Sequence, residues 1–190
     1  MSSDGSAPQT APETAPQTAS QEGSVAAGKD RGPGKSLRAR GPRAISRLAA
    51  IQALYQMEIA QTDAGLVIDE FVQFRFDGDQ ATKLYSGADR GFFRKLVTDV
   101  VRHQRELDPV IDAQLASGWR LGRIDAILRA ILRAATVELR YYDDVPVKVV
   151  INEYIEVSRE FFEADEPKVV NGVLDALGKK LRPVQTAPGS

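Results

Sequence analysis

Few residues in this sequence have the types and spacing that catalysis requires. The chain of 190 residues has no cysteine and a single histidine, His103. Disulfides, thiolate metal sites and multi-histidine metal sites within one chain are therefore excluded. A nucleophilic triad needs a histidine base poised by a carboxylate, but His103 lies in the sequence RHQREL and no Gly-x-Ser-x-Gly elbow occurs. We interpret His103 as a packing histidine on a helix face.

The other common catalytic signatures are also missing from the sequence. Neither Gly-x-Gly-x-x-Gly nor Gly-x-x-x-x-Gly-Lys-Ser/Thr occurs, so no nucleotide cradle is indicated. Several aspartates are of the kind that helices expose or use as caps, and nothing indicates the sugar-binding cleft of a two-carboxylate site. These are Asp108, Asp112, Asp125, Asp143 and Asp144. The sequence predicts a protein that is not an enzyme and that uses no cofactor and no metal.

The strongest chemical signal is a basic segment near the start of the chain. Residues 28–47 hold seven Lys and Arg side chains against one Asp, although the net charge of the whole chain is −1. Arg38, Arg40, Arg43 and Arg47 lie where a polar tail meets the first expected helix, and a helix N-terminus itself attracts phosphate. This pattern favours phosphate contact with RNA or DNA. A solvated basic linker is the alternative that charge alone leaves open.

A second polar cluster lies near the end of the chain. Lys168, Asn171 and Asp175 follow one another at steps of three and four, so they share a helix face that is distinct from the apolar stripe beside it. A Lys and an Asn at a helix start can hold phosphate and base edges. An ordinary exposed helix face is the other interpretation of the same spacing.

The elements that must position these residues are helices. Apolar side chains recur at steps of three and four, and no segment alternates as a strand would. We predict an all-α fold of roughly six or seven helices. The periodicity is clearest in residues 124–174, where it predicts two amphipathic helices that are joined by an acidic turn and followed by a third. The other expected helices cover about 43–60, 64–75 and 89–106, and a further helix restarts at Asp108-Pro109.

Some local features follow from single residues. Leu48, Ile51, Tyr55 and Ile59 line one face of the first helix. Gly118 is expected in the left-handed conformation that ends a helix, with Trp119 packing back just beyond it. Residues 77–90 lack periodicity and are expected to form a loop.

Composition sets the domain boundaries. Residues 1–42 hold half of the ten prolines, and residues 1–40 are expected to form a disordered Pro/Ala/Gly-rich tail that ends in the basic segment. Residues 41–183 should form one helical domain, and residues 184–190 a disordered end. No run of about 18 apolar residues exists, so we expect no membrane span. We also expect no secretory signal and a cytoplasmic location.

Many residues recur in the order and spacing of one family. The shared residues are Arg47 with Ile51-Gln52-Ala53-Leu54-Tyr55, Asp89 with Phe92-Phe93 and Leu96-Val97, His103, Glu106-Leu107-Asp108, Gly118-Trp119, Arg123-Ile124-Asp125 and Ala130-Ile131-Leu132-Arg133. The most specific are Val145-Pro146-Val147-Lys148-Val149-Val150-Ile151-Asn152-Glu153 and Val170-Asn171-Gly172-Val173-Leu174-Asp175. Together they resemble the NusB transcription antitermination family across roughly residues 41–182.

The resemblance implies a fold, a function and two surfaces. The fold is two three-helix bundles packed into one NusB-like domain. The function is a non-enzymatic RNA-binding role in bacterial transcription antitermination. There the protein pairs with NusE, a small-subunit ribosomal protein, on boxA RNA of ribosomal transcripts. The pair joins the RNA polymerase elongation complex with other Nus factors. The implied RNA-binding residues are Arg38, Arg40, Arg43, Arg47, Gln52, Asp165, Lys168, Val169 and Asn171, and the implied partner-binding residues are Asp99, Glu106, Asp125 and Leu128.

The sequence departs from the family pattern at three places. Val169 stands where the family has Phe before Val-Asn-Gly, and base–aromatic stacking is worth about 1–3 kcal/mol. Leu128 stands where an acidic residue is frequent on the partner side. Ala44 and Ile45 occupy frequently basic positions, for which Arg38 and Arg40 can compensate.

Two other functions remain as alternatives. One is an RNA-binding accessory domain, since NusB-like domains also open certain ribosomal RNA cytosine methyltransferases. The other is a structural adaptor that has lost RNA binding, as Val169 would allow. The family includes monomers and dimers, so the resemblance also allows a homodimer that masks the RNA surface.

Overall fold

The computed structural model describes residues 41–76 and 84–183, and every regular element within these ranges is helical. The expected tail 1–40, the expected end 184–190 and residues 77–83 of the expected loop lie outside the described residues. The main helices are α2 (Pro42–Ala60), α3 (Ala64–Glu70), α4 (Arg90–Asp112), α5 (Ala126–Tyr141), α6 (Val147–Ser158) and α7 (Glu166–Leu181). A π-helical turn, η1 (Phe71–Phe76), extends α3, and a 3₁₀ turn, η2 (Leu121–Arg123), precedes α5.

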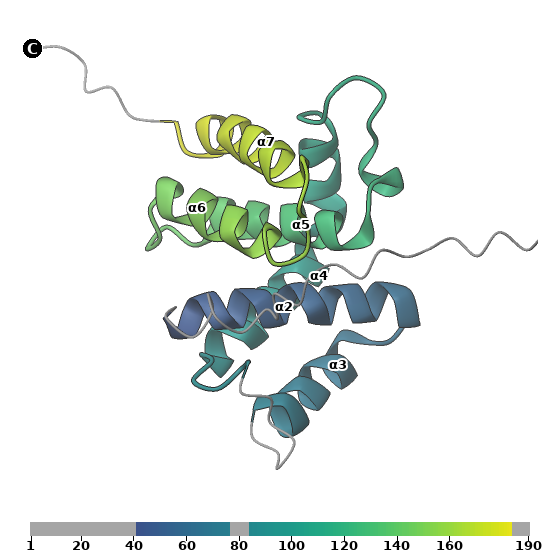
Figure 1. The fold of residues 1–190 in the computed structure, drawn as a ribbon, viewed down its shortest axis with the longest axis vertical. Coiled ribbons are helices and arrows are strands. Elements are labelled where there is room, and N and C mark those ends of the chain that lie inside the picture. Colours follow the sequence, from purple (N-terminus) through teal and green to yellow (C-terminus); the bar gives the residue numbers. More distant parts are fainter. Residues whose placement is uncertain (1–40, 77–83, 184–190) are drawn as a thin grey trace, which may run out of the picture. The chain divides into compact units, whose positions relative to one another are not determined.

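The helices form two groups of three. Helices α2, α3 and α4 pack against one another, and α5, α6 and α7 do the same (Figure 1). The groups join because α5 also packs against α2 and α4. Apart from Arg133, all of the α5 residues from Ala130 to Leu139 are buried, which makes α5 the central helix. The predicted all-α fold of two three-helix bundles is confirmed.

Aspartates begin three of the helices. The Asp63 carboxylate accepts a hydrogen bond from the Gly65 N–H at the start of α3. Asp89 accepts from the Phe92 N–H at the start of α4. Asp125 accepts from the N–H groups of Ile127 and Leu128 at the start of α5. Such caps stabilise a helix by about 0.5–2 kcal/mol each. The chain therefore uses these acids for folding.

The end of α4 and the segment after it differ in part from what the sequence predicted. Helix α4 continues through Pro109 rather than restarting there. Buried Leu107 and Ile111 hold both sides of Pro109 against the core, which offsets the one backbone hydrogen bond that proline cannot make. Gly118 has the expected left-handed backbone, with φ +86°, but it does not end a helix, because α4 already ends at Asp112 and Gly118 lies in a separate turn. Trp119 is not packed into the core as expected, since 45% of the residue is exposed.

Some apolar side chains that share the periodic pattern are not buried. Tyr55 and Ile59 on α2 are exposed, as are Leu66 on α3 and Phe74 on η1. Periodicity identified the apolar face of α2 correctly, but within residues 41–76 and 84–183 no helix buries the far end of that face. These exposed side chains become relevant to the candidate site.

Candidate nucleic-acid interface

Arg43 is the expected RNA-binding arginine that the structure leaves at the surface. It lies in the first turn of α2, and half of its side chain is exposed. Its Nη1 donates a hydrogen bond to Asp144 Oδ2 at 3.0 Å, and its guanidinium lies 5.3 Å from the centre of the Phe92 ring. Arg38 and Arg40 lie outside the described residues. Arg43 is therefore the described part of the basic segment that a phosphate can reach.

Arg47 has a different role from the expected one. The residue is only 3% exposed, and its guanidinium donates to Glu138 Oε2 at 2.7 Å and to Glu138 Oε1 at 2.8 Å. Its Nη1 donates to Glu153 Oε2 at 3.1 Å. Burial lowers the pKa of Arg47, but the hydrogen bond to Glu138 and the nearby negative charges raise it above its ordinary value. The expectation that Arg47 contacts RNA is corrected: it is a core cation that joins α2 to α5 and α6.

A sequence signal for this buried pair exists, although helical spacing alone missed it. Glu138 lies between Val137 and Leu139, within a run of α5 residues that are otherwise apolar or small, and it is fully buried. Buried carboxylates are almost always paired. An acid in such a run therefore predicts a buried cation from another helix, and Arg47 supplies it.

The second expected half of the RNA surface lies at the start of α7. Asp165, Lys168 and Asn171 are exposed there, and the Lys168 Nζ lies 2.7 Å from Asp165 Oδ1. The hydrogen bond from Lys168 lowers the pKa of Asp165, and the same contact raises the pKa of Lys168. Val169 is half-buried against the core, so it does not present the exposed aromatic face that the family pattern has there.

The two halves lie at opposite ends of α7. Arg182, just after α7, donates to the carbonyl oxygens of Val145 and Glu138, next to the turn that holds Asp144. Arg43 is therefore near the end of α7, whereas Lys168 is near its start. Helix α7 has 16 residues, which corresponds to a length of about 24 Å. A ligand that touches both halves must be extended.

Helix α6 connects these two ends along α2. Asp144, before α6, pairs with Arg43, and Glu153, within α6, pairs with Arg47 one turn further along α2. Phe161, after α6, lines a groove together with residues from the middle of α2. The chain then continues from Phe161 to the start of α7. Arg43 and the middle of α2 therefore lie along the contact between α2 and α6, and Lys168 follows at the start of the next helix, α7.

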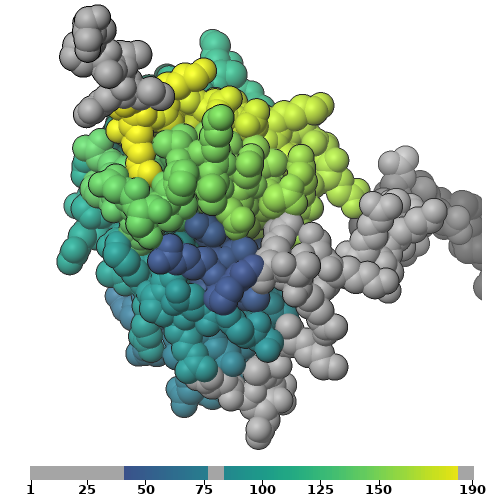
Figure 2. All heavy atoms as spheres, turned by 90° about the vertical axis from the view of Figure 1, so that its left-hand side faces the viewer, coloured from purple at the N-terminus to yellow at the C-terminus, as the bar shows by residue number. Residues whose placement is uncertain are grey.

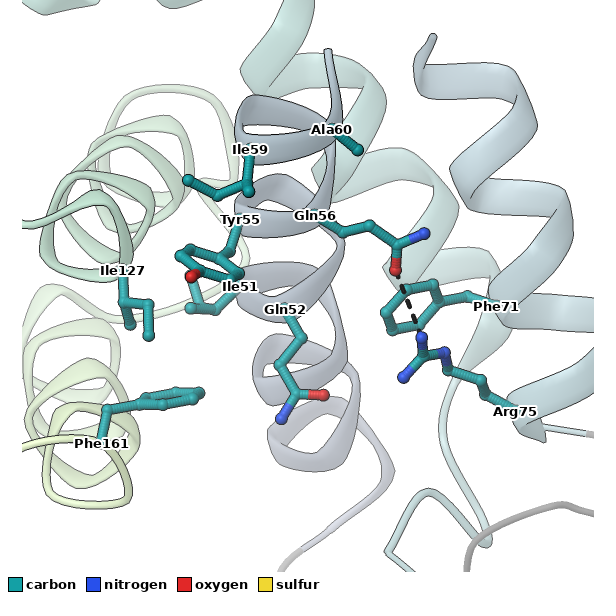
Figure 3. A pocket seen from close by; sticks show the side chains of 10 residues that line it. All are labelled: Ile51, Gln52, Tyr55, Gln56, Ile59, Ala60, Phe71, Arg75, Ile127 and Phe161. Carbon is teal, nitrogen blue, oxygen red and sulfur yellow. Dashed lines mark hydrogen bonds between the residues drawn. The ribbon is translucent and has the colours of Figure 1, made fainter. Parts of the chain in front are cut away.

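A groove opens at the middle of α2 (Figure 3). Tyr55, Ile59, Ile127 and Phe161 lie on one side of it, while Gln56, Phe71 and Arg75 lie on the other. Gln52 is at the same place, and its Oε1 accepts a hydrogen bond from the Tyr85 hydroxyl. The groove combines exposed apolar side chains of α2 with half-buried ones from the other bundle, so it suits a protein partner better than a phosphate chain.

The expected partner-binding residues do not form one surface. Leu128 is 2% exposed, so it is a core residue, and its expected contact with a partner is corrected. Leu128 belongs to the buried core, which explains why an apolar side chain is accepted there. Asp125 caps α5, Asp99 accepts from the Tyr142 hydroxyl at 3.0 Å, and Glu106 accepts from the Tyr141 hydroxyl at 3.1 Å. Ile127, next to Leu128, is the α5 residue that lines the groove.

His103 has the packing role that the sequence indicated. Its ring lies 4.3 Å from the Tyr141 ring, centre to centre, and its Nδ1 is 3.2 Å from the Tyr141 hydroxyl. Among the described residues, no three His, Cys, Asp or Glu side chains are grouped as a metal site would require. None of the described helices is both long and apolar enough to span a bilayer.

The fold and the site define a class: an all-helical, two-bundle domain with exposed polar residues at the starts of α2 and α7 and a groove lined by residues of both bundles. The NusB family model matches residues 44–179. The chain is 49% identical over 141 residues to the transcription antitermination protein NusB of Caulobacter vibrioides, covering 74% of this chain and 95% of that protein.

A similar protein from Sinorhizobium fredii carries the same name. It is 48% identical over 140 residues, covering 74% of this chain and 88% of its own length. The solved structure of T. maritima NusB aligns with a TM-score of 0.64 at 29% identity, covering 76% of this chain and 95% of that one. The chain belongs to the NusB family. This confirms the resemblance, and the family is one of non-enzymatic factors.

Proposed function

We propose that this protein is a bacterial transcription antitermination factor that binds boxA RNA of ribosomal transcripts together with NusE. The observation that carries the proposal is family membership over nearly the whole described domain, since relatives that are 48–49% identical bear the antitermination name. The protein would act in the cytoplasm on nascent RNA, as part of the RNA polymerase elongation complex with other Nus factors. Arg38 and Arg40 would extend its basic surface.

The proposed RNA surface runs along the border between the bundles. Arg43 at one end and Lys168 with Asn171 at the other supply phosphate and base contacts. Helix α7, whose two ends lie near these two groups, is about 24 Å long, and contact with both groups suits an extended single strand. Single-stranded RNA is the form in which sequence is normally recognised, because its unstacked bases are accessible.

The proposed NusE contact is the groove beside α2. Tyr55 and Ile59 are exposed large apolar side chains, and Ile127 and Phe161 from the other bundle complete the patch. Aromatic and aliphatic side chains of this kind form the centres of protein interfaces. Residues 48–190 carry 22 acidic and 18 basic side chains, so this part of the chain complements a basic ribosomal protein.

The alternative of an accessory domain related to ribosomal RNA methyltransferases has no specific observation in its favour. The chain covers 95% and 88% of two relatives that are named antitermination proteins. We therefore retain the antitermination function as the conclusion.

The test of the RNA surface is a titration of a boxA oligonucleotide into the parent, Arg43→Ala and Lys168→Ala. Each variant should weaken binding by about two- to fivefold at low salt, the scale of one exposed charge contact. Arg94→Ala is the matched control, because Arg94 is as exposed as Arg43 and pairs with Asp69 at 3.1 Å in the same way.

The outcome separates two errors. If Arg43→Ala and Lys168→Ala bind as the Arg94→Ala control does, the surface is assigned to the wrong residues. If the parent does not bind boxA RNA with or without NusE, the proposed function itself is wrong. A salt titration shows whether the binding is driven by phosphate contacts, since the affinity then falls steeply with salt.

A further inference from the structure

The guanidinium of Arg43 is already paired with a carboxylate from the other bundle. Asp144 lies in the turn between α5 and α6, 101 residues from Arg43 in the sequence, and accepts a hydrogen bond from Arg43 Nη1 at 3.0 Å. Figure 2 looks onto this end of the domain. The start of α2, in blue, lies between the green α5–α6 region above it and the teal α4 region below it.

Both members of the pair are held by their surroundings. The Arg43 guanidinium lies over the Phe92 ring, and the first turn of α2 is closed by hydrogen bonds from the Ala44 and Ile45 N–H groups to Gly41 O. The turn that holds Asp144 is fixed by Arg182, whose Nη1 donates to Val145 O at 2.7 Å. The pair therefore joins two segments that are each held by their own hydrogen bonds.

The other acids at this end have different tasks. Asp89 caps α4, and Glu138 and Glu153 bind Arg47. Asp89 and Glu153 line the same hollow as Arg43 and Asp144. Asp144 is well exposed and makes its closest ion pair with Arg43. Of these acids, Asp144 is therefore the one whose charge would repel a phosphate bound to Arg43 most directly.

We propose that Asp144 is an internal competitor of RNA phosphate for Arg43. It keeps the guanidinium in place over Phe92, but it occupies the Nη1 group that a phosphate oxygen would take. RNA binding at this end is therefore an exchange, in which a phosphate replaces a carboxylate that remains nearby and repels it. This inference rests on the proposed RNA-binding function and adds a residue that sets its affinity.

The competitor stays charged under ordinary conditions. The hydrogen bond from Arg43 lowers the pKa of Asp144 below its usual value. Asp144 therefore opposes a phosphate throughout the neutral range, and its effect depends on salt rather than on pH.

Replacing Asp144 with Asn tests the competition, because Asn keeps the size of the side chain and removes its charge. Asp144→Asn should bind a boxA oligonucleotide about three- to fivefold more tightly than the parent at low salt, the scale of one exposed ion pair. The salt dependence should steepen by about 0.7 in the slope of log K against log salt, since one more cation is available to the strand. A uridine oligonucleotide of equal length should show the same gain, because the contact is to phosphate.

Two control variants remove the same charge elsewhere. Asp69→Asn breaks the ion pair with Arg94, which matches the Arg43–Asp144 pair in exposure and distance. Asp143→Asn removes the charge of the residue next to Asp144. The Asp143 side chain is 90% exposed, and its Oδ1 lies 3.4 Å from Arg182 Nη2. Both variants should alter RNA affinity by less than about twofold, because screening weakens effects between exposed charges that are not in contact.

A double variant identifies Arg43 as the group through which Asp144 acts. In an Arg43→Ala background, Asp144→Asn should give no more gain than Asp143→Asn does. Thermal unfolding of each variant confirms that the fold is retained. The inference is overturned if Asp144→Asn binds as the parent does or more weakly, or if its gain persists without Arg43. Failure of the proposed function looks different, because the parent itself then binds neither oligonucleotide.

Discussion

Replacing Arg47 with Ala should unfold the domain more easily without removing an RNA contact. The substitution deletes the cation that pairs with Glu138 and Glu153, and it leaves the fully buried Glu138 carboxylate without its main partner. Breaking a buried ion pair by removing one member costs about 3–5 kcal/mol. For a domain of this size, about 1 kcal/mol shifts the Tm by roughly 2–4 °C, so a decrease of about 6–20 °C is expected.

Denaturant unfolding followed by circular dichroism measures this loss. Arg47→Lys is the graded variant, because it keeps the charge but loses the two-pronged contact of the guanidinium with Glu138. It should fall between the parent and Arg47→Ala. Arg43→Ala is the control, since an exposed pair contributes about 0–1 kcal/mol. If Arg47→Ala loses less than about 1 kcal/mol and instead weakens RNA binding, the assignment of Arg47 to the core is wrong.

Two further predictions concern the groove and the α4–α5 connection. Ile59→Glu should weaken NusE binding at least tenfold while leaving RNA binding without NusE within about twofold, because a charge in the centre of an apolar contact must lose its water on binding. Pull-down titrations measure both affinities, and Leu66→Glu is the control, since Leu66 is similarly exposed but lies outside the groove. Equal loss of NusE binding in both variants would contradict the assignment of the groove. Asp112→Asn should destabilise the domain at neutral pH, because the hydrogen bond from the Leu121 N–H and the contact with Arg120 lower the pKa of Asp112 in the folded state. That stabilisation is present above the unfolded pKa of about 3.9 and is lost as the pH falls through the lower folded pKa, so the parent and the variant should converge in acid unfolding curves below about pH 4.

The sequence predicted the helices well because their start signals are local. Asp89 and Asp125 cap helices that begin next to them. These features depend on residues a few positions apart. Pro109 shows the limit of such rules, since packing of Leu107 and Ile111 keeps α4 continuous through it.

The candidate site was harder to predict because it depends on neighbours far away in the sequence. Helical spacing places Arg43 and Arg47 on one side of α2, but it does not reveal that Glu138, 91 residues away, draws Arg47 into the core. Likewise, an apolar stripe indicates that a face is covered without saying by what. Tyr55 and Ile59 belong to such a stripe and remain exposed beside Phe161 and Ile127.

The most direct measurement for the proposed function compares the affinity of the parent protein for boxA RNA and for a scrambled oligonucleotide of the same length, each with and without purified NusE. We predict tighter binding of boxA RNA, and a further gain of at least tenfold when NusE is present, because two linked contacts raise the overall affinity. Equal affinity for the two oligonucleotides, with no change on adding NusE, would contradict the proposed function.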